Sequence, residues 1–398
     1  MNGTLKLAAP LVLAVAVSAC NAGGSTSLPV GGGQSAATGA TMPQWQMTRD
    51  ASRACNGPRT GGQMQCDALI LNRGFGPMVN GWAPTDFQTA YNLPSSSKGA
   101  GVKVAIVDAF DNPNVASDLA AYRTQFNLGT AKFTKYNQKG QKKNYPQGNT
   151  GWGVEIDLDV QMVSASCPKC TIYLIEANDN YGNNLYAAEK EAVKLGATII
   201  SNSWGGGAGS ASGGAFSQKG ITYLASAGDG GYGMQDPADY DDVLSIGGTL
   251  LHKNGSAYTE SVWPDSGGGC SVVTKPSWQN DPKCSERTGN DIAAVAYGVA
   301  LYDTYGNNGW GEVGGTSVSS PLLAGVFGLA NNAQQGGKNF WTASSKTIKK
   351  YMHTTISGTL NGCPSQYTGT YICDGDTGQY KTYSSPAGWG SPNGIGAF

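Results

Sequence analysis

Short apolar runs alternate with helical patterns through the middle of the chain, and this alternation limits the folds that the chain can adopt. The runs that have the length of buried strands lie at 102–107, 171–175, 198–201, 221–226 and 243–246. Helical patterns lie between them at 115–126, 152–165 and 186–195. Strands and helices that alternate in this way are typical of a mostly parallel sheet with crossover helices on both faces. We therefore predict an α/β fold, in one domain that spans residues 77–398.

The first twenty residues have the pattern of an export signal. Lys6 gives a positive start, residues 7–17 are apolar, and the sequence V-S-A-C ends at Cys20. The apolar stretch is too short to span a bilayer comfortably. Since V-S-A-C resembles the lipobox of bacterial lipoproteins, we expect a signal peptide at 1–19, lipid on Cys20, and a flexible tether over 20–42. An ordinary signal peptide that is cleaved nearby is the alternative.

The cysteines favour disulfides. The chain has nine, and eight remain without Cys20, an even number in an exported chain. Two of these eight, Cys55 and Cys66, lie in a short segment, 43–76, before the predicted domain. The spacing suggests local pairs without proving the connectivity: Cys55 with Cys66, Cys167 with Cys170, Cys270 with Cys284, and Cys363 with Cys373. A redox or metal site at Cys167 and Cys170 is the alternative, although no second C-x-x-C or nearby histidine completes a zinc site.

The charge balance excludes some classes of partner. Lys and Arg total 26, Asp and Glu total 27, and no long run of like charge occurs. The chain therefore lacks the mark of a protein that binds nucleic acid or an acidic membrane surface. Only 13% of the residues are charged, a composition that secreted hydrolases often share. We expect a monomer whose substrate is not a polyanion.

A glycine-rich turn precedes an apolar helix around Ser317. The sequence G-G-T-S-V-S-S-P ends at Pro321, and the apolar run 322–329 follows it. Glycines permit a tight turn, and a serine at the start of the helix would be exposed to substrate beside backbone N–H groups. An N-cap serine with proline in the first turn is the alternative. We predict a nucleophile, because G-T-S-x-x-x-P resembles the serine motif of subtilisins and sedolisins.

A serine nucleophile needs a general base, and the histidines are poor candidates for it. The chain has only His252, beside a lysine in a predicted turn, and His353, in a late predicted helix. Neither lies in a motif of the subtilisin His-Gly-Thr-His type. We expect both to be surface or packing residues.

Two carboxylates offer a different base. Glu155 and Asp159 are four residues apart in a segment with helical periodicity, so they share one helix face, whereas Asp157 points elsewhere. Carboxylates at this spacing repel each other, and a solvated acidic face is the ordinary interpretation. If the pair is buried beside Ser317, one carboxylate can accept the serine proton while the other orients and supports the first.

Asp229 follows an apolar strand pattern, in the sequence S-A-G-D-G-G. A turn aspartate is the ordinary interpretation of such a position. A protonated Asp229 could instead donate a hydrogen bond to the oxyanion that develops during acyl transfer, whereas an ionised one would repel it. This role predicts an acidic working range.

Three motifs in this order resemble those of the sedolisins, the serine-carboxyl peptidases: Glu155-x-x-x-Asp159, S-A-G-Asp229-G and G-T-Ser317-x-x-x-P. The resemblance covers about residues 77–398 and includes A-I-V-D at 105–108, S-N-S-W-G at 201–205 and G-W-G at 388–390. It implies a subtilisin-like fold and endopeptidase activity at low pH. It also implies that Ser317 is the nucleophile, Glu155 its base, Asp159 the support for Glu155, and Asp229 the oxyanion partner.

Two features depart from the sedolisin pattern. Members of that family begin with a large folded propeptide, but only a short segment separates Cys20 from residue 77. Inhibition before secretion therefore works differently or is missing. Family members also bind calcium through two aspartates. The residues that match these aspartates in this sequence are Thr354 and Ser384, with Lys381 close by. Without those carboxylates a calcium site loses most of its attraction.

The expected function is therefore that of an exported serine endopeptidase that hydrolyses polypeptides in the bacterial cell envelope. Its contact with a membrane would be the N-terminal lipid alone. A binding or adhesion lipoprotein on a decayed peptidase scaffold is the alternative, suggested by the short leader and the weakened calcium site. The intact catalytic set argues against decay. We expect no required cofactor, and Asp374 and Asp376 are weak calcium candidates for which a plain turn is the alternative.

Overall fold

The computed structural model describes residues 51–56, 61–71, 74–207 and 213–398. All of them belong to one unit that spans Ala37–Phe398. The predictions for the signal peptide, Cys20 and the tether lie outside the described residues. Within these ranges, the helices lack the combination of length and apolarity that a bilayer crossing requires.

Eight strands of the described residues form the central sheet, in the order β12-β11-β9-β7-β4-β6-β5 with β15 beside β11. Their bounds are β4 (Lys103–Ala109), β5 (Lys132–Asn137), β6 (Thr171–Ala177), β7 (Ile199–Asn202), β9 (Thr222–Ser226), β11 (Val243–Asn254), β12 (Ala257–Val262) and β15 (Ile292–Val295). Neighbouring strands pair in parallel, except that β12 pairs antiparallel with β11. The predicted α/β class with a mostly parallel sheet is thus confirmed.

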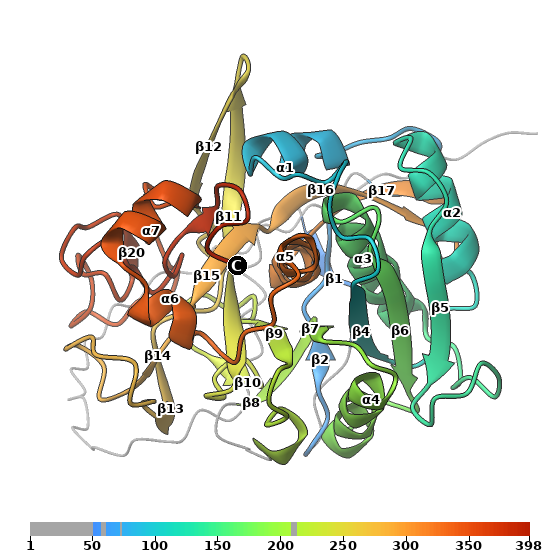
Figure 1. The fold of residues 1–398 in the computed structure, drawn as a ribbon, viewed down its shortest axis with the longest axis horizontal. Coiled ribbons are helices and arrows are strands. Elements are labelled where there is room, and N and C mark those ends of the chain that lie inside the picture. The colour runs from blue at the N-terminus through green and yellow to red at the C-terminus, as the bar shows by residue number, and fades with distance from the viewer. Residues whose placement is uncertain (1–50, 57–60, 72–73, 208–212) are drawn as a thin grey trace, which may run out of the picture. The chain divides into compact units, whose positions relative to one another are not determined.

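Helices cover both faces of this sheet (Figure 1). The described helices are α1 (Pro84–Ala90), α2 (Val115–Gln125), α3 (Thr150–Ser166), α4 (Gly182–Lys194), α5 (Thr316–Ala330), α6 (Lys338–Thr342) and α7 (Ser345–Tyr351). α3 and α5 pack against each other, and α4 packs on β4 and β6 from the other side. The Asn149 side chain caps α3 by accepting a hydrogen bond from Trp152 N at 3.0 Å. From Trp152 to its end α3 is buried, so its polar side chains lie inside the protein.

The predicted elements agree in type with the observed ones and differ at several ends. β11 continues well beyond the predicted run 243–246, because its second half forms an antiparallel hairpin with β12. His252 therefore lies in a strand, and its placement in a turn is wrong. The helical placement of His353 is also wrong, since α7 ends at Tyr351 and His353 belongs to β18 (Met352–His353), which pairs with β21 (Ser391–Pro392).

The described part of the N-terminal segment pairs with strands of the domain. β1 (Ala51–Arg53) and β3 (Leu69–Leu71) extend a sheet formed by β17 (Gly309–Gly314) and β16 (Tyr297–Asp303). β2 (Gln65–Cys66) pairs antiparallel with β8 (Trp204–Gly207), whose other neighbour is β10 (Gln235–Asp236). The blue segment in Figure 1 therefore belongs structurally to the domain that follows it.

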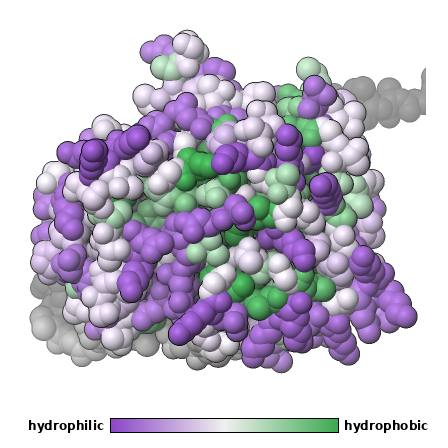
Figure 2. Space-filling view, in the orientation of Figure 1, coloured by the Kyte–Doolittle hydropathy of each residue, from purple (hydrophilic) through white to green (hydrophobic). Residues whose placement is uncertain are grey.

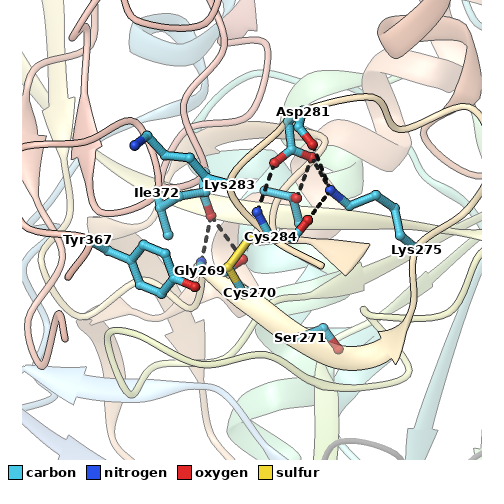
Figure 3. Close-up of a disulfide and its surroundings, with 12 residues drawn as sticks. Gly269, Cys270, Ser271, Lys275, Asp281, Lys283, Cys284, Tyr367 and Ile372 are labelled. Carbon is cyan, nitrogen blue, oxygen red and sulfur yellow. Dashed lines mark hydrogen bonds and ion pairs between the residues drawn. A yellow bond between two sulfur atoms is a disulfide. The ribbon is translucent and has the colours of Figure 1, made fainter. Parts of the chain in front are cut away.

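Four disulfides join the cysteine pairs that the spacing suggests: Cys55–Cys66, Cys167–Cys170, Cys270–Cys284 and Cys363–Cys373. Figure 3 shows the third of these, beside the hairpin of β13 (Cys270–Thr274) and β14 (Glu286–Thr288). Lys275 supports the intervening loop by donating to the Asp281 carboxylate at 2.9 Å. A second small hairpin joins β19 (Gly358–Thr359) to β20 (Asp374–Gly375).

Hydrophilic residues are spread over the face shown in Figure 2, with smaller hydrophobic areas between them.

Candidate active site

Ser317 lies in the first turn of α5, two residues after Gly315. Gly315 has a φ of 111°, a conformation that favours glycine. A Cβ at this position would also lie 1.8 Å from the carbonyl oxygen of Asp67. The glycine therefore permits both the sharp turn into α5 and the close approach of another backbone segment.

The Ser317 hydroxyl contacts a carboxylate on the neighbouring helix. Ser317 Oγ donates a hydrogen bond to Glu155 Oε2 at 2.8 Å. Glu155 and Asp159 both have 0% exposure, so the interpretation of this helix face as solvated is wrong. That alternative placed the side chains at the surface because charged helix positions usually face water. In the structure, α3 is enclosed by α5, α2, β16 and β4.

Asp159 is linked to the serine through Ser203. Ser203 Oγ donates to Asp159 Oδ1 at 2.7 Å, and the Ser203 carbonyl oxygen accepts from Ser317 Oγ at 3.3 Å. Asp157 lies elsewhere, as expected, and accepts a hydrogen bond from Asn112 Nδ2 at 2.6 Å. On α3, therefore, Glu155 and Asp159 lie on the side of Ser317, whereas Asp157 does not.

Burial changes the protonation of these carboxyls. It raises the pKa of Glu155 well above its usual range, and the charges of Asp159 and Asp108 raise it further. Burial also raises the pKa of Asp159, with a further contribution from Asp108. The pKa of Asp108 rises to about 8 because that side chain is fully buried in β4. Neighbouring carboxyls of this kind titrate as a group.

Asp229 lies just after β9, and one of its two oxygens is fixed by Thr316. Thr316 donates to Asp229 Oδ1 from its backbone N at 2.8 Å and from Oγ1 at 2.9 Å. The buried Oδ2 lies 2.9 Å from the point that a Cβ on Gly315 would occupy, beside the turn that carries Ser317. Burial raises the pKa of Asp229 well above its usual range, and the charge of Asp67 adds to this effect. A protonated Oδ2 could donate a hydrogen bond into the site.

The expectation that Ser317 is exposed is wrong for this structure, in which its exposure is 0%. The reason is the N-terminal segment, whose Ala68 N donates to Glu155 Oε2 at 2.8 Å. β3 then pairs with β17, the strand that leads into Ser317. The sequence gives a signal for neither contact, because they join residues far apart in the chain.

The two histidines bond to other groups. His252 Nε2 lies 2.8 Å from Ser261 Oγ, and His353 Nε2 lies 3.1 Å from the Ala90 carbonyl oxygen. The side chain that accepts a hydrogen bond from Ser317 Oγ is therefore the carboxylate of Glu155.

The residues at the expected calcium positions do not fit that ion. Ser384 N donates to the Gly388 carbonyl at 3.1 Å, and the Lys381 ammonium lies over the Trp389 ring at 5.6 Å, so a cation already occupies this neighbourhood. Thr359 Oγ1 donates to Asp374 Oδ1, while Asp376 adopts a turn conformation with φ of 50°. The donor set thus lacks the several carboxylate oxygens that a calcium site needs.

A separate group of buried carboxyls lies beside α3. Asp118, Asp157 and Asp303 each place an oxygen within 4.8 Å of the others. Thr304 N donates to Asp118 at 2.9 Å and Tyr305 N to Asp303 at 2.7 Å, so protein donors already use part of this group. Burial raises the pKa of all three carboxyls, so each of them holds a proton more tightly than it would in water.

Reasoning from the sequence missed two members of the site. Asp108 and Ser203 were part of recognised sequence patterns, but no role was predicted for either. The signal for Asp108 was present, because a carboxylate within an apolar strand pattern is seldom buried without a partner. Ser203, between β7 and β8, gives no such signal, since its contact with Asp159 joins residues 44 positions apart in the chain.

Comparisons with known proteins agree with this fold. The profile of the subtilase family matches residues 129–390. The chain is 26% identical to sedolisin of Pseudomonas sp. (strain 101) over 366 residues, covering 79% of this chain and 60% of that protein. It is 28% identical to kumamolisin of Bacillus sp. (strain MN-32) over 290 residues, covering 63% of this chain and 52% of that protein. The matched regions thus span little more than half the length of these relatives.

A solved structure of Pseudomonas sedolisin, described as a serine-carboxyl proteinase complexed with two molecules of pseudo-iodotyrostatin, has a similar fold. Its TM-score is 0.64 at 25% identity, and the match covers 80% of this chain and 96% of that chain.

Proposed function

The chain belongs to the subtilase family, and from this membership we propose that it is a serine endopeptidase of the sedolisin type. The observation that carries the proposal is the 2.8 Å hydrogen bond from Ser317 Oγ to Glu155 Oε2. A hydroxyl bonded to a buried carboxylate has both parts of an activated nucleophile, the attacking oxygen and the base that takes its proton.

The first half of the reaction uses Ser317 and Glu155. The Ser317 oxygen attacks the substrate carbonyl carbon while Glu155 accepts the hydroxyl proton. Asp159 lies one turn further along α3, where Ser203 holds it at 2.7 Å, so it orients Glu155 and shares its proton. Glu155 then gives the proton to the leaving amine, and water hydrolyses the acyl-serine ester by the reverse steps.

Asp229 acts on the oxygen of the substrate carbonyl. As that oxygen becomes negative, the protonated Oδ2 of Asp229 donates a hydrogen bond to it. The raised pKa of Asp229 supports this role, because burial keeps the proton on the carboxyl group at acidic pH. An ionised Asp229 would repel the developing charge, so activity is restricted to acidic conditions.

The substrates are polypeptides, and the reaction requires no cofactor. The poor fit of Thr354 and Ser384 to calcium supports a peptidase that is stable without that ion. The four disulfides support an oxidising compartment outside the cytosol, and V-S-A-C supports a lipid on Cys20. The enzyme would act as a monomer in the cell envelope, in contact with the membrane through that lipid.

The Ser317–Glu155 hydrogen bond favours catalysis over the binding or adhesion alternative, because a binding surface has no need of a buried serine and carboxylate in contact. The deciding experiment is digestion of acid-denatured haemoglobin by the wild-type protein and by Ser317→Ala across a range of pH. Wild type should cleave it at acidic pH and Ser317→Ala should not. Equal cleavage by both proteins would reject the proposal.

A further inference from the structure

One peptide bond of the chain lies at the catalytic residues. Ala68 N donates to Glu155 Oε2 at 2.8 Å, the same oxygen that accepts from Ser317 Oγ. Asp67 N donates to the Ser203 carbonyl at 3.1 Å, and this carbonyl also accepts from Ser317 Oγ at 3.3 Å. The N–H groups on both sides of the Asp67 carbonyl therefore share their acceptors with the Ser317 hydroxyl.

The Asp67 carbonyl oxygen lies beside the proposed oxyanion partner. A Cβ on Gly315 would be 1.8 Å from this oxygen and 2.9 Å from Asp229 Oδ2, so both oxygens crowd the same point. Within the described residues Oδ2 is buried and has no hydrogen-bond partner. A proton on Oδ2 would find the Asp67 carbonyl as an acceptor.

Backbone pairing holds this peptide on both sides. Before it, β2 pairs antiparallel with β8, with Gln65 opposite Gly205. After it, β3 pairs antiparallel with β17, with Leu69 opposite Gly314. The chain from 65 to 70 is therefore bound by strand addition, the mode in which an extended peptide is gripped through its main chain.

The Asp67 side chain occupies a polar pocket. It is 1% exposed, and its Oδ2 accepts from Ser226 Oγ at 2.6 Å and from Gln235 Nε2. A Cβ on Gly205 would lie 2.0 Å from Gln235 Cδ, so glycine at 205 leaves the space for this amide. The pocket therefore presents two donors to a short side chain that carries a carbonyl-type oxygen.

We propose that Asp67–Ala68 is a cleavage site of the peptidase itself, and that the Ser226 and Gln235 pocket selects Asp or Asn on the acyl side of substrates. The inference rests on the proposed function, whose chemistry it uses. It adds to that function a processing site and a substrate class.

The cleavage uses the same atoms as the general reaction. Ser317 Oγ forms a bond to the Asp67 carbonyl carbon, and its proton moves to Glu155. The carbon–nitrogen bond to Ala68 then breaks, and Glu155 gives the proton to the Ala68 nitrogen, its hydrogen-bond partner at 2.8 Å. A water molecule hydrolyses the Asp67 ester and restores Ser317, which leaves a carboxylate on Asp67 and an amine on Ala68.

Before cleavage the segment keeps other substrates out, because Ser317 has 0% exposure beneath it. This segment would therefore control the activity of the enzyme until the Asp67–Ala68 bond is cut. Cleavage would also separate residues 68–398 from Cys20, and so from a lipid attached there.

The first test follows the intact mass and the N-terminal sequence of the purified full chain at acidic pH. Wild type should yield a chain that begins at Ala68, and Ser317→Ala should remain whole at this bond. Asp67→Asn should be processed at a rate close to wild type. Asp67→Leu, which is similar in size but accepts no hydrogen bond, should be processed at least about tenfold more slowly.

The second test measures substrate choice in trans. Peptides with the sequence of residues 63–70, with Ser in place of Cys66, carry Asp, Asn or Leu at the position of Asp67. The wild-type enzyme should prefer Asp and Asn over Leu by at least about tenfold in kcat/KM. Gln235→Met, which keeps the length of the side chain and removes its donor, should reduce this ratio, an effect that a merely structural role would not produce.

The outcomes separate this inference from the proposed function. A wild-type protein that digests denatured haemoglobin but leaves Asp67–Ala68 intact would overturn the inference alone. Processing of Ser317→Ala at the wild-type rate would overturn self-cleavage, and equal rates for Leu and Asp peptides would overturn the pocket. If neither haemoglobin nor the chain itself is cut, the proposed function fails as well.

Discussion

Glu155 and Ser317 are 162 residues apart in the sequence, yet their side chains meet at 2.8 Å because α3 and α5 pack against each other inside the protein. Neither helix could carry this contact at the surface, where water would compete for both groups. The buried interface thus fixes the geometry and also sets the protonation of the carboxylate, since burial raises the pKa of Glu155.

Glu155→Gln should leave the fold intact and remove the base. The amide oxygen can still accept from Ala68 N, but it cannot take the Ser317 proton. We expect kcat to fall by about 10²- to 10⁴-fold. Steady-state kinetics on a peptide substrate checks the loss, and thermal melting checks the fold. Asp157→Asn, on the same helix but bonded to Asn112, is the control and should keep most of the activity.

Asp159→Asn should shift the pH profile rather than abolish the reaction. The charge of Asp159 raises the pKa of Glu155, so its removal lowers that pKa. The acidic limb of kcat/KM should therefore move to lower pH, with a smaller loss of kcat than in Glu155→Gln. An acidic limb that stays in place would contradict the coupling between the two carboxyls.

The fold should be more stable at acidic than at neutral pH. Burial raises the pKa of Asp157 above its value in the unfolded chain, so the folded state binds this proton more tightly. That contribution is complete below the unfolded pKa and is lost as pH rises through the folded pKa. Melting temperatures of Ser317→Ala, which avoids self-digestion, should fall toward neutral pH, and Asp157→Asn should make the fall shallower. The same slope in both proteins would exclude Asp157 as a contributor.

Chelation of calcium should leave the melting temperature unchanged. Thr354 and Ser384 supply no carboxylate, and the Lys381 ammonium lies 5.6 Å from the Trp389 ring in the same region. Thermal melting with and without EGTA measures this directly. A clear drop with the chelator would show that calcium binds, and Asp374→Asn and Asp376→Asn would then identify the ligands.

The central sheet could be predicted because its signals are local. The run around Ile106 is apolar along its length, as a strand buried on both faces must be, and the i, i+4 spacing of Glu155 and Asp159 is set by helix geometry alone. The disulfide pairs could be suggested because each closes a short loop.

The burial of Ser317 beneath the segment that contains β2 and β3 could not be predicted. β2 and β3 are strands of two and three residues, too short for a periodic pattern, and their partners β8 and β17 lie far along the chain. The Asp67 pocket likewise combines Ser226 and Gln235 from two other strands. Such contacts depend on the assembled fold rather than on any one stretch of sequence.

The most direct test of the account is kcat/KM against pH for wild type, Asp229→Asn and Asp229→Ala. Wild type should peak at acidic pH and lose activity as Asp229 ionises, because the oxyanion then loses its donor. Asp229→Asn donates without titrating, so it should keep part of the activity and soften the alkaline limb, whereas Asp229→Ala should lose about 10²- to 10³-fold in kcat. A wild-type optimum at neutral or alkaline pH, with the same alkaline limb in Asp229→Asn, would contradict the carboxyl-based mechanism.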